Sequence, residues 1–245
     1  LWLSTNLNEK DVVAGGEVKL EEAIIEADRR YRPASIIVVA SCVPGIIGDD
    51  LEGVVAKVQP QVNGKILLVH CEGFKTKVMA TAYDAVYHAI SRSLLEFDKD
   101  EERIFKDEIE EAAEKIRRSK RVNLMNVSSG TPGDEKELTR LLNALGLEVK
   151  IFPCYAHPED MKYATEAALS ISTCPTHDDY FLKHLKEKYN VPYLLRYMPI
   201  GIQNTNSWLR EVAKFFHLEE EAERLIERET AELELALKPI RENLK

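Results

Sequence analysis

The 245-residue sequence has only four cysteines, and no two of them form a Cys-x-x-Cys pair. They are Cys42, Cys71, Cys154 and Cys174. Isolated thiols of this kind fit a reducing, cytoplasmic environment better than a disulfide-bonded secreted scaffold. The sequence therefore predicts a cytoplasmic protein whose cysteines are either buried in its core or used as ligands.

Two further features are missing, and each absence excludes a class of partner. No apolar run approaches the roughly 20 residues that span a bilayer, which argues against a membrane protein. The net charge is −9, and no cluster of Lys and Arg is interleaved with aromatic residues, which argues against nucleic-acid binding. With 44% hydrophobic and 31% charged residues, the composition is that of an ordinary globular protein.

The start of the chain, LWLSTNLNEK, has neither an initiator Met nor a basic leader segment. We therefore expect an internal fragment of a longer protein. Its length is enough for one large or two modest α/β domains, each with a proper core.

Strand and helix patterns alternate along the first half of the chain. Residues 35–41 and 65–71 are short β-branched runs typical of buried parallel strands. Helices are predicted at 48–59, which opens on acidic residues, and at 80–95. Residues 97–121 are almost all charged, so we expect a solvated, partly helical surface segment and a domain boundary there.

The second half repeats the alternation. Strands are expected at 121–129, 147–156, 168–173 and 191–201. Helices are expected at 130–146, 157–169, 174–190, at 204–216 with an Asn or Thr cap, and at 219–245. Repeated strand–helix units predict two Rossmann-like α/β domains, 1–116 and 117–245, each a parallel sheet with helices on both faces.

Cys174 stands between an apolar run and a helix that opens on Pro175, so it is the expected N-cap residue. The positive end of a helix favours thiolate over thiol, which suits a nucleophile and a soft-metal ligand equally well. A nucleophile needs a base, and only His177 is near in sequence, without oxyanion glycines. A zinc site would need further ligands at familiar spacing. From the residues alone, a buried structural cysteine is favoured.

Cys42 and Cys71 also stand at the ends of predicted strands. Cys42 is followed by a Pro-Gly turn and an acidic helix start, and Cys71 by Gly73. Parallel sheets bind ligands beyond the carboxyl ends of their strands, so these thiols point to a soft metal or a cluster. Turn chemistry alone is the alternative. The residues by themselves do not identify a reaction.

Several stretches together resemble the α subunit of nitrogenase component 1 and its nitrogenase-like relatives. They occur in the family's order and cover nearly the whole chain. The stretches are NEKDVVAGGEVKL (8–20), SCVPGIIGDDLEGV (41–54), HCEGF (70–74), STCPTHDDYFLKHLKEKYNVPY (172–193) and PIGIQNTNSWLREVAKFF (199–216).

The resemblance implies two metal roles and a three-domain architecture. Cys42 matches a ligand of the P-cluster, an 8Fe-7S type cluster at the interface with the β subunit. Cys174 matches the cysteine that ligates the terminal iron of a large iron–sulfur cofactor, and thiolate is the usual ligand of such clusters. Cys71 matches a cysteine that is not a ligand, and Cys154 matches no assigned position.

The sequence departs from the family at the reactive face of the cofactor. Dinitrogen reducers carry a Gln and, four residues on, a His, where this chain has Met79 and Tyr83. The resemblance therefore implies a nitrogenase-like reductase with another small-molecule substrate, and methylthio-alkane reductases, which cleave C–S bonds, are the leading candidate. Electrons would come from an ATP-dependent iron–sulfur reductase into a heterotetramer of α and β subunits.

Three alternatives stay open. They are a cofactor-assembly scaffold of the same superfamily, a true alternative nitrogenase α subunit, and a cluster-free α/β domain. The family's other α-subunit P-cluster cysteines would precede Leu1 and its cofactor histidine would follow Lys245, which again implies an internal fragment.

Overall fold

The computed structural model describes residues 1–75, 78–95, 106–125 and 132–243. The chain divides into two compact units, each made of segments that are discontinuous in sequence. The first unit comprises 1–103, 155–165 and 176–190, and the second comprises 104–154, 166–175 and 191–245. The division into contiguous domains 1–116 and 117–245 stays a prediction, and each unit is described below by itself.

The first unit is built on two parallel strands, β1 (Ser35–Ala40) and β2 (Lys65–His70). Their register runs from Ser35 opposite Lys65 to Ala40 opposite His70. The helical elements of this unit are α1 (Glu9–Ala14), α2 (Glu17–Tyr31), α3 (Cys42–Ile47), α4 (Leu51–Val58), η1 (Gln59–Gln61), α5 (Met79–Ser93), η2 (Pro158–Glu166) and α8 (Pro175–Tyr189). Glu166, the last residue of η2, and Pro175, the first residue of α8, are assigned to the second unit.

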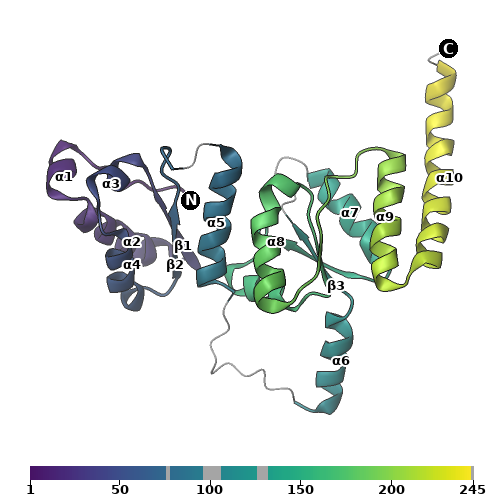
Figure 1. The fold of residues 1–245 in the computed structure, drawn as a ribbon, viewed down its shortest axis with the longest axis horizontal. Helices are drawn as coiled ribbons and strands as arrows, with labels where there is room; N and C mark the ends of the chain where they lie inside the picture. The colour runs from purple at the N-terminus through teal and green to yellow at the C-terminus, as the bar shows by residue number, and fades with distance from the viewer. Residues whose placement is uncertain (76–77, 96–105, 126–131, 244–245) are drawn as a thin grey trace. The chain divides into compact units, whose positions relative to one another are not determined.

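Helices cover both faces of this small sheet. Side chains alternate along a strand, so Val38 and Ala40 face one side, where α2 and α4 pack against them. Leu67 and Val69 of β2 point to the opposite face, and α5 packs along β2 there (Figure 1). Strand β2 is therefore covered on both faces, whereas Ile37 and Val39 of β1 stay exposed on the α5 face.

The second unit is a four-stranded parallel sheet in the order β4-β3-β5-β6. Its strands are β3 (Arg121–Met125), β4 (Glu148–Phe152), β5 (Leu169–Ile171) and β6 (Tyr193–Leu194). Its helices are α6 (Glu108–Arg118), α7 (Pro132–Ala144), α9 (Ile202–Phe216) and α10 (Glu219–Asn243). Because the strands are parallel, the segments that follow them meet at one edge of the sheet.

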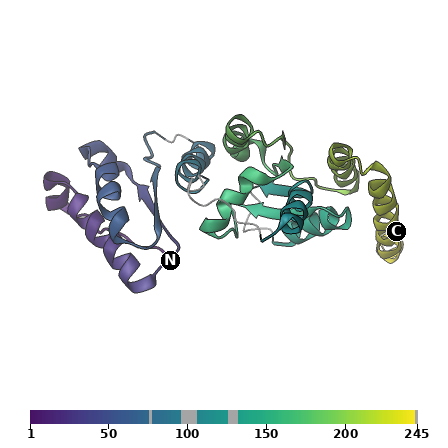
Figure 2. The same cartoon turned by 90° about the horizontal axis from the view of Figure 1, so that it is seen from below.

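The core of the second unit joins the sheet to α7, α9 and α10. Leu124 and Ile171 are completely buried against Leu142 of α7 and Val212 of α9. Helix α10 begins directly after α9 and lies beside it in Figures 1 and 2, with Ala222 and Leu225 in the same core. The predicted α/β fold with parallel sheets and helices is thus confirmed.

Two expected elements differ in the structure. The helix expected at 157–169 is the 3-10 helix η2, which buries Met161 and Ala164 three residues apart, as three residues per turn allow. The strand expected at 191–201 pairs only at Tyr193 and Leu194. Prolines at 192 and 199 have no N–H for the ladder, which limits the strand on both sides.

The cap of α9 and the turn after β1 also differ from expectation. The residue before α9 is Gly201 at φ +85°, a conformation that favours glycine, and no side chain caps it. Asn204 and Thr205 instead donate to the carbonyls of Ile200 and Gly201. After β1, the Pro-Gly dipeptide lies inside α3 rather than in an open turn.

The charged segment 97–121 is only partly solvated; its residues 97–105 lie outside the described part of the chain. Arg121 at the start of β3 and Glu114 of α6 are buried. The guanidinium of Arg121 lies 3.3 Å from carboxylate oxygens of both Glu148 and Glu166 and 3.6 Å from Glu114. Charged side chains are tolerated in a core when they are paired with opposite charges. The partners Glu148 and Glu166 are distant from Arg121 in sequence, so charge composition alone does not predict its burial.

Among the described residues, no helix combines the length and the apolar character that crossing a bilayer requires.

Candidate functional site

Cys42 is the first residue of α3, directly after β1, and its thiol is exposed. The backbone N–H of Gly73, in the segment after β2, donates a hydrogen bond to Cys42 Sγ at 3.2 Å. A Cβ at position 73 would lie 3.3 Å from that sulfur, so a side chain there would crowd it. The neighbouring strand ends β1 and β2 thus place one thiol next to one backbone donor.

A buried carboxylate, that of Glu72, directly precedes the Gly73 donor in the chain. Glu72 is 1% exposed, and its Oε1 accepts a hydrogen bond from Lys75 Nζ at 2.8 Å and lies 3.3 Å from His70 Nδ1. Burial alone would raise the pKa of Glu72, but the hydrogen bonds from Lys75 and His70 outweigh burial and the pKa is lowered. The carboxylate therefore stays ionised in the folded protein.

Glu72 also fixes the shape of α3. A Cβ on Gly45 would lie 2.7 Å from Glu72 Cγ, so only glycine lets the helix that carries Cys42 pack this closely. His70 extends the contact to α4, because its Nε2 lies 2.9 Å from Glu52 Oε1. The thiol, its donor and the two helices after β1 thus form one connected group.

The adjacent acids after α3 have two separate tasks. Asp50 is the N-cap of α4 and accepts a hydrogen bond from the N–H of Gly53 at 2.9 Å, as an acidic helix start predicts. Asp49 Oδ1 accepts from the N–H of Gly16 at 3.0 Å, which ties the Gly-Gly loop before α2 to this region. Sequence reasoning assigned both acids to the helix start and missed this second bond.

Cys174 directly precedes Pro175, the first residue of α8, as the sequence predicts. The two residues before it are buried and held on both sides. Thr173 Oγ1 donates to the carbonyl of Met125 at 2.9 Å, and Ser172 Oγ lies 2.6 Å from both the carbonyl and the N–H of Arg196. The half-buried thiol is therefore presented at the carboxyl edge of the sheet from a fixed backbone.

The other two cysteines are half-buried as well. Cys71 follows β2 in the first unit, and Cys154 follows β4 at the same sheet edge as Cys174. In strand order, β3 lies between β4 and β5, so the residues after β4 and after β5 are on either side of it. Position alone therefore does not separate Cys154 from Cys174.

Met79 and Tyr83 lie one turn apart at the start of α5. Met79 is 65% exposed, and Tyr83 is half-buried. The ring of Tyr83 stacks on that of His177 from α8, with centroids 4.1 Å apart and planes 12° apart. His177 is thus brought to a predicted site residue, a contact that no sequence spacing reveals.

The α5–α8 contact also contains a poorly satisfied acid. Asp84 Oδ1 is buried without a hydrogen-bond partner, and Asp179 lies nearby. Burial, and then the charge of Asp179, raises the pKa of Asp84 above its usual 3.8. The charged form is therefore disfavoured in the folded state.

Replacing Asp84 by asparagine is expected to stabilise the protein at pH 7. For an acid with a raised pKa, the stabilising effect is complete below the unfolded pKa and is lost as the pH rises through the folded pKa. Asp84→Asn should thus raise the melting temperature by about 2–4 °C at pH 7, the shift that about 1 kcal/mol gives at this size, and by little near pH 3. A lower melting temperature at pH 7 would contradict this interpretation.

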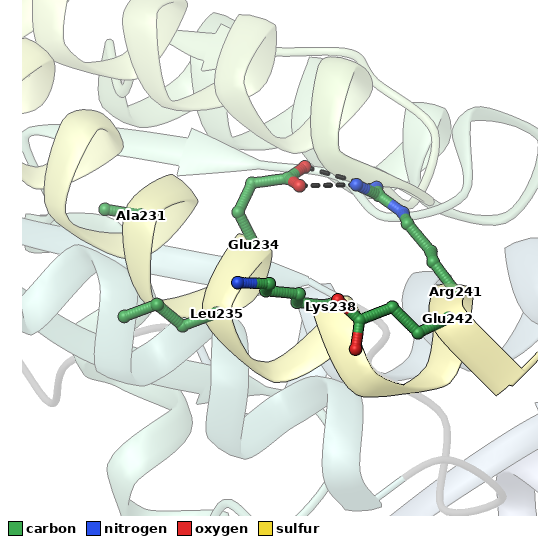
Figure 3. Close-up of a pocket in the computed structure, with 6 residues that line it drawn as sticks. All are labelled: Ala231, Glu234, Leu235, Lys238, Arg241 and Glu242. Carbon is green, nitrogen blue, oxygen red and sulfur yellow. Dashed lines mark hydrogen bonds and ion pairs between the residues drawn. The ribbon is translucent and has the colours of Figure 1, made fainter.

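A hollow of about 490 Å³ lies along the surface of α10. Figure 3 shows it lined by side chains of this helix alone, with an ion pair between Glu234 and Arg241 along it. None of the predicted site residues lies there.

Cys42 and Cys174 each fit the role of a single thiolate ligand to a cluster. Cys42 Sγ already accepts an N–H hydrogen bond, as a cluster-bound thiolate does, and Cys174 directly precedes the first residue of α8. In the described part of the chain, no three His, Cys, Asp or Glu side chains come together as a metal site. A cluster held here would therefore need further ligands from outside these residues.

The predicted residues fall in both units. Cys42, Met79 and Tyr83 belong to the first unit and Cys174 to the second. Within the first unit, the structure adds Gly73, Glu72 and His177 to the predicted set. The spacing Cys-Glu-Gly after a strand indicated a turn there, but nothing in it indicated a buried carboxylate or a donor to another thiol.

Comparison with known proteins gives concordant matches over this whole chain. The family model described as "Nitrogenase component 1 type Oxidoreductase" matches residues 2–245. The nitrogenase iron-molybdenum cofactor biosynthesis protein NifE of Rippkaea orientalis is 31% identical over 253 residues, covering 100% of this chain and 49% of that protein. The nitrogenase molybdenum-iron protein alpha chain of Methanosarcina barkeri is 29% identical, covering 98% of this chain and 43% of that protein.

A solved structure gives the same result. The structure "Nitrogenase Cp1 at pH 6.5" matches with a TM-score of 0.81 and 26% identity, over 98% of this chain and 44% of that chain. The chain thus spans about half the length of the curated relatives it matches.

Proposed function

Because this chain belongs to the nitrogenase component 1 type oxidoreductase family, we propose that it is part of the α subunit of a nitrogenase-like metalloreductase. The observation that carries this proposal is the Cys42 thiol, exposed at a strand end and already hydrogen-bonded by the N–H of Gly73. An exposed thiol in such a fixed setting is suited to shared ligation with a second subunit. A buried structural cysteine would need neither exposure nor a donor.

In this proposal Cys42 is one ligand of a P-cluster at the interface with a β subunit, and Cys174 ligates a large iron–sulfur cofactor. When bound, the cofactor supplies the multi-electron reduction chemistry, fed by an ATP-dependent iron–sulfur reductase. The chain contributes ligation, burial and orientation. Ser172 and Thr173 hold the backbone before Cys174, and the N–H of Gly73 donates a hydrogen bond that orients the Cys42 sulfur.

The substrate is proposed to be a small molecule other than dinitrogen. Tyr83 presents a phenol where dinitrogen reducers present an imidazole, and Met79 presents a thioether where they present an amide. A phenol donates a proton or hydrogen bond from a group with a pKa near 10 in model compounds, whereas imidazole changes charge near neutral pH. C–S bond cleavage is the candidate reaction.

A second candidate function is that of a cofactor-assembly scaffold. It is favoured by the similarity to proteins described as NifE, at 31% identity in Rippkaea orientalis and 30% in Methanosarcina barkeri. Such a protein would keep Cys174 and its clamped backbone but would not turn over substrate. Turnover by the purified complex together with its reductase distinguishes the two, because a scaffold shows none while still containing iron.

The P-cluster role is tested by replacing Cys42 with alanine. In the full-length subunit co-purified anaerobically with its partner, Cys42→Ala is expected to lower iron content and to weaken subunit association, because a shared ligand is lost. The matched control is Cys71→Ala, which removes a half-buried thiol after the neighbouring strand. Equal iron content in wild-type and Cys42→Ala complexes would refute the ligand role, as would an equal loss in both variants.

A further inference from the structure

Helices α5 and α8 pack through a ladder of stacked rings. The first rung is Tyr83 on His177, at 4.1 Å between centroids, and the second is Tyr87 on Phe181, at 4.7 Å. Each rung is four residues from the other on both helices, so the rungs lie one turn apart and the helices run in the same direction. The starts of α5 and α8 are therefore at the same end of the ladder.

The second rung is a closed, structural contact. Tyr87 and Phe181 are both buried, and the Tyr87 hydroxyl donates to Asp178 Oδ1 at 3.1 Å. Every polar atom of the Tyr87 side chain is thus accounted for inside the unit. This rung shows that a phenylalanine of α8 packs well against a tyrosine of α5 in this geometry.

The first rung differs in setting. Tyr83 and His177 are only half-buried and lie near the starts of their helices, four residues after Met79 and three after Cys174 along the chain. The rings stack with planes 12° apart, so the imidazole N–H groups lie in a plane nearly parallel to the phenol. The imidazole contacts the face of the phenol and does not meet its hydroxyl in line.

We propose that His177 is a positioning residue for Tyr83, holding the phenol by ring-on-ring contact in one orientation at the reactive face. This inference rests on the proposed function, which places Tyr83 beside the cofactor. A tyrosine ring has two rotatable bonds, and a stack on one face removes most of their freedom. Neither the resemblance nor the sequence spacing assigns this role, since the position of His177 three residues after Cys174 indicates only a base for that thiol.

The orientation of the phenol matters because its hydroxyl is the group that meets the substrate. Misplacement of a reacting group by about 1 Å can cost about 100-fold in rate. Loss of the stack should therefore reduce kcat more than it raises KM, because proton donation in the transition state is more sensitive to the direction of the hydroxyl than ground-state binding is. A flat ring at position 177 should suffice, whether or not it carries nitrogen.

The test compares two variants of His177 in the full-length complex. His177→Phe keeps a flat ring, as Phe181 does in the second rung, and His177→Leu keeps apolar volume without a ring. We expect His177→Phe to retain kcat and His177→Leu to lose about 10- to 100-fold in kcat with little change in KM. Electron cryo-microscopy is expected to show Tyr83 in one orientation in the wild type and His177→Phe, and spread over several in His177→Leu.

Two results would overturn the positioning role of His177. Unchanged kcat and a fixed Tyr83 ring in His177→Leu would overturn it, and so would an equal loss in His177→Phe, which would mean that the imidazole itself is required. If His177→Leu fails to assemble, His177→Phe alone still decides, through its kcat and the position of the ring. An iron-free wild-type complex would refute the proposed function, whereas the position of the ring in the variants would still test the stack.

Discussion

Replacing Cys174 by alanine is expected to give a full-length complex that assembles but lacks its large iron–sulfur cofactor. The thiol stands at the sheet edge on a backbone held by Ser172 and Thr173, and alanine at this position has no sulfur to bind the cofactor iron. Changes in outer-shell residues typically cost about 10- to 100-fold in metal affinity or activity, so loss of a ligand should cost more than about 100-fold in turnover. Iron analysis and the spectrum of the resting complex provide the measurement.

Cys154→Ala is the matched control for this prediction. Cys154 is also half-buried and also follows a strand at the carboxyl edge of the same sheet. It should therefore lose a comparable amount of packing but retain the cofactor. Full iron content and turnover in Cys174→Ala would remove the ligand role, and cofactor loss in both variants would mean that the edge needs both thiols.

Replacing Arg121 by methionine is expected to destabilise the protein by about 3–5 kcal/mol. The side chain of Arg121 is 5% exposed and lies within 3.3–3.6 Å of the carboxylates of Glu114, Glu148 and Glu166. Methionine fills a similar volume but removes the buried cation that all three carboxylates share, and leaves them the more exposed Arg117 and Arg118. The free energy of unfolding, measured by chemical denaturation at pH 7, tests the prediction.

The same substitution at an exposed arginine provides the control. Arg140 pairs with Glu137 and Glu229, but its side chain is 46% exposed. Water solvates the carboxylates once the arginine is gone, so Arg140→Met should cost no more than about 1 kcal/mol. Similar losses at both positions would show that burial of the Arg121 group does not determine its contribution.

Patterns that depend on local sequence could be predicted, and contacts between distant segments could not. The apolar runs of β1 and β2, the helix start at Pro175 and the long α10 follow from composition and spacing, and the structure confirms them. The short extent of β6 has a local cause as well, because Pro192 and Pro199 have no N–H to donate to a neighbouring strand. Each of these features is determined by a few residues that are close together in the sequence.

The candidate site shows the limit more clearly. That Cys42 would stand at a strand end was predicted, but its bond to Gly73 joins residues 31 apart in sequence. The burial of Glu72 and Arg121 depends on partners that the chain brings from elsewhere, and charge composition predicts only exposure. The stack of Tyr83 on His177 is similar, because a histidine three residues after a cysteine first indicates a base for that cysteine.

The ring ladder also has a consequence for how the protein is made. Its second rung includes a hydrogen bond between residues 91 apart, so α5 is synthesised long before the helix that covers it. At about 5–20 residues per second, the ribosome needs roughly 5–20 s to reach α8 after completing this part of α5. During that interval the aromatic face around Tyr87 has no partner helix. A nascent chain stalled before residue 177 would thus expose this hydrophobic face of α5 to chaperones. Synthesis of α8 buries the face.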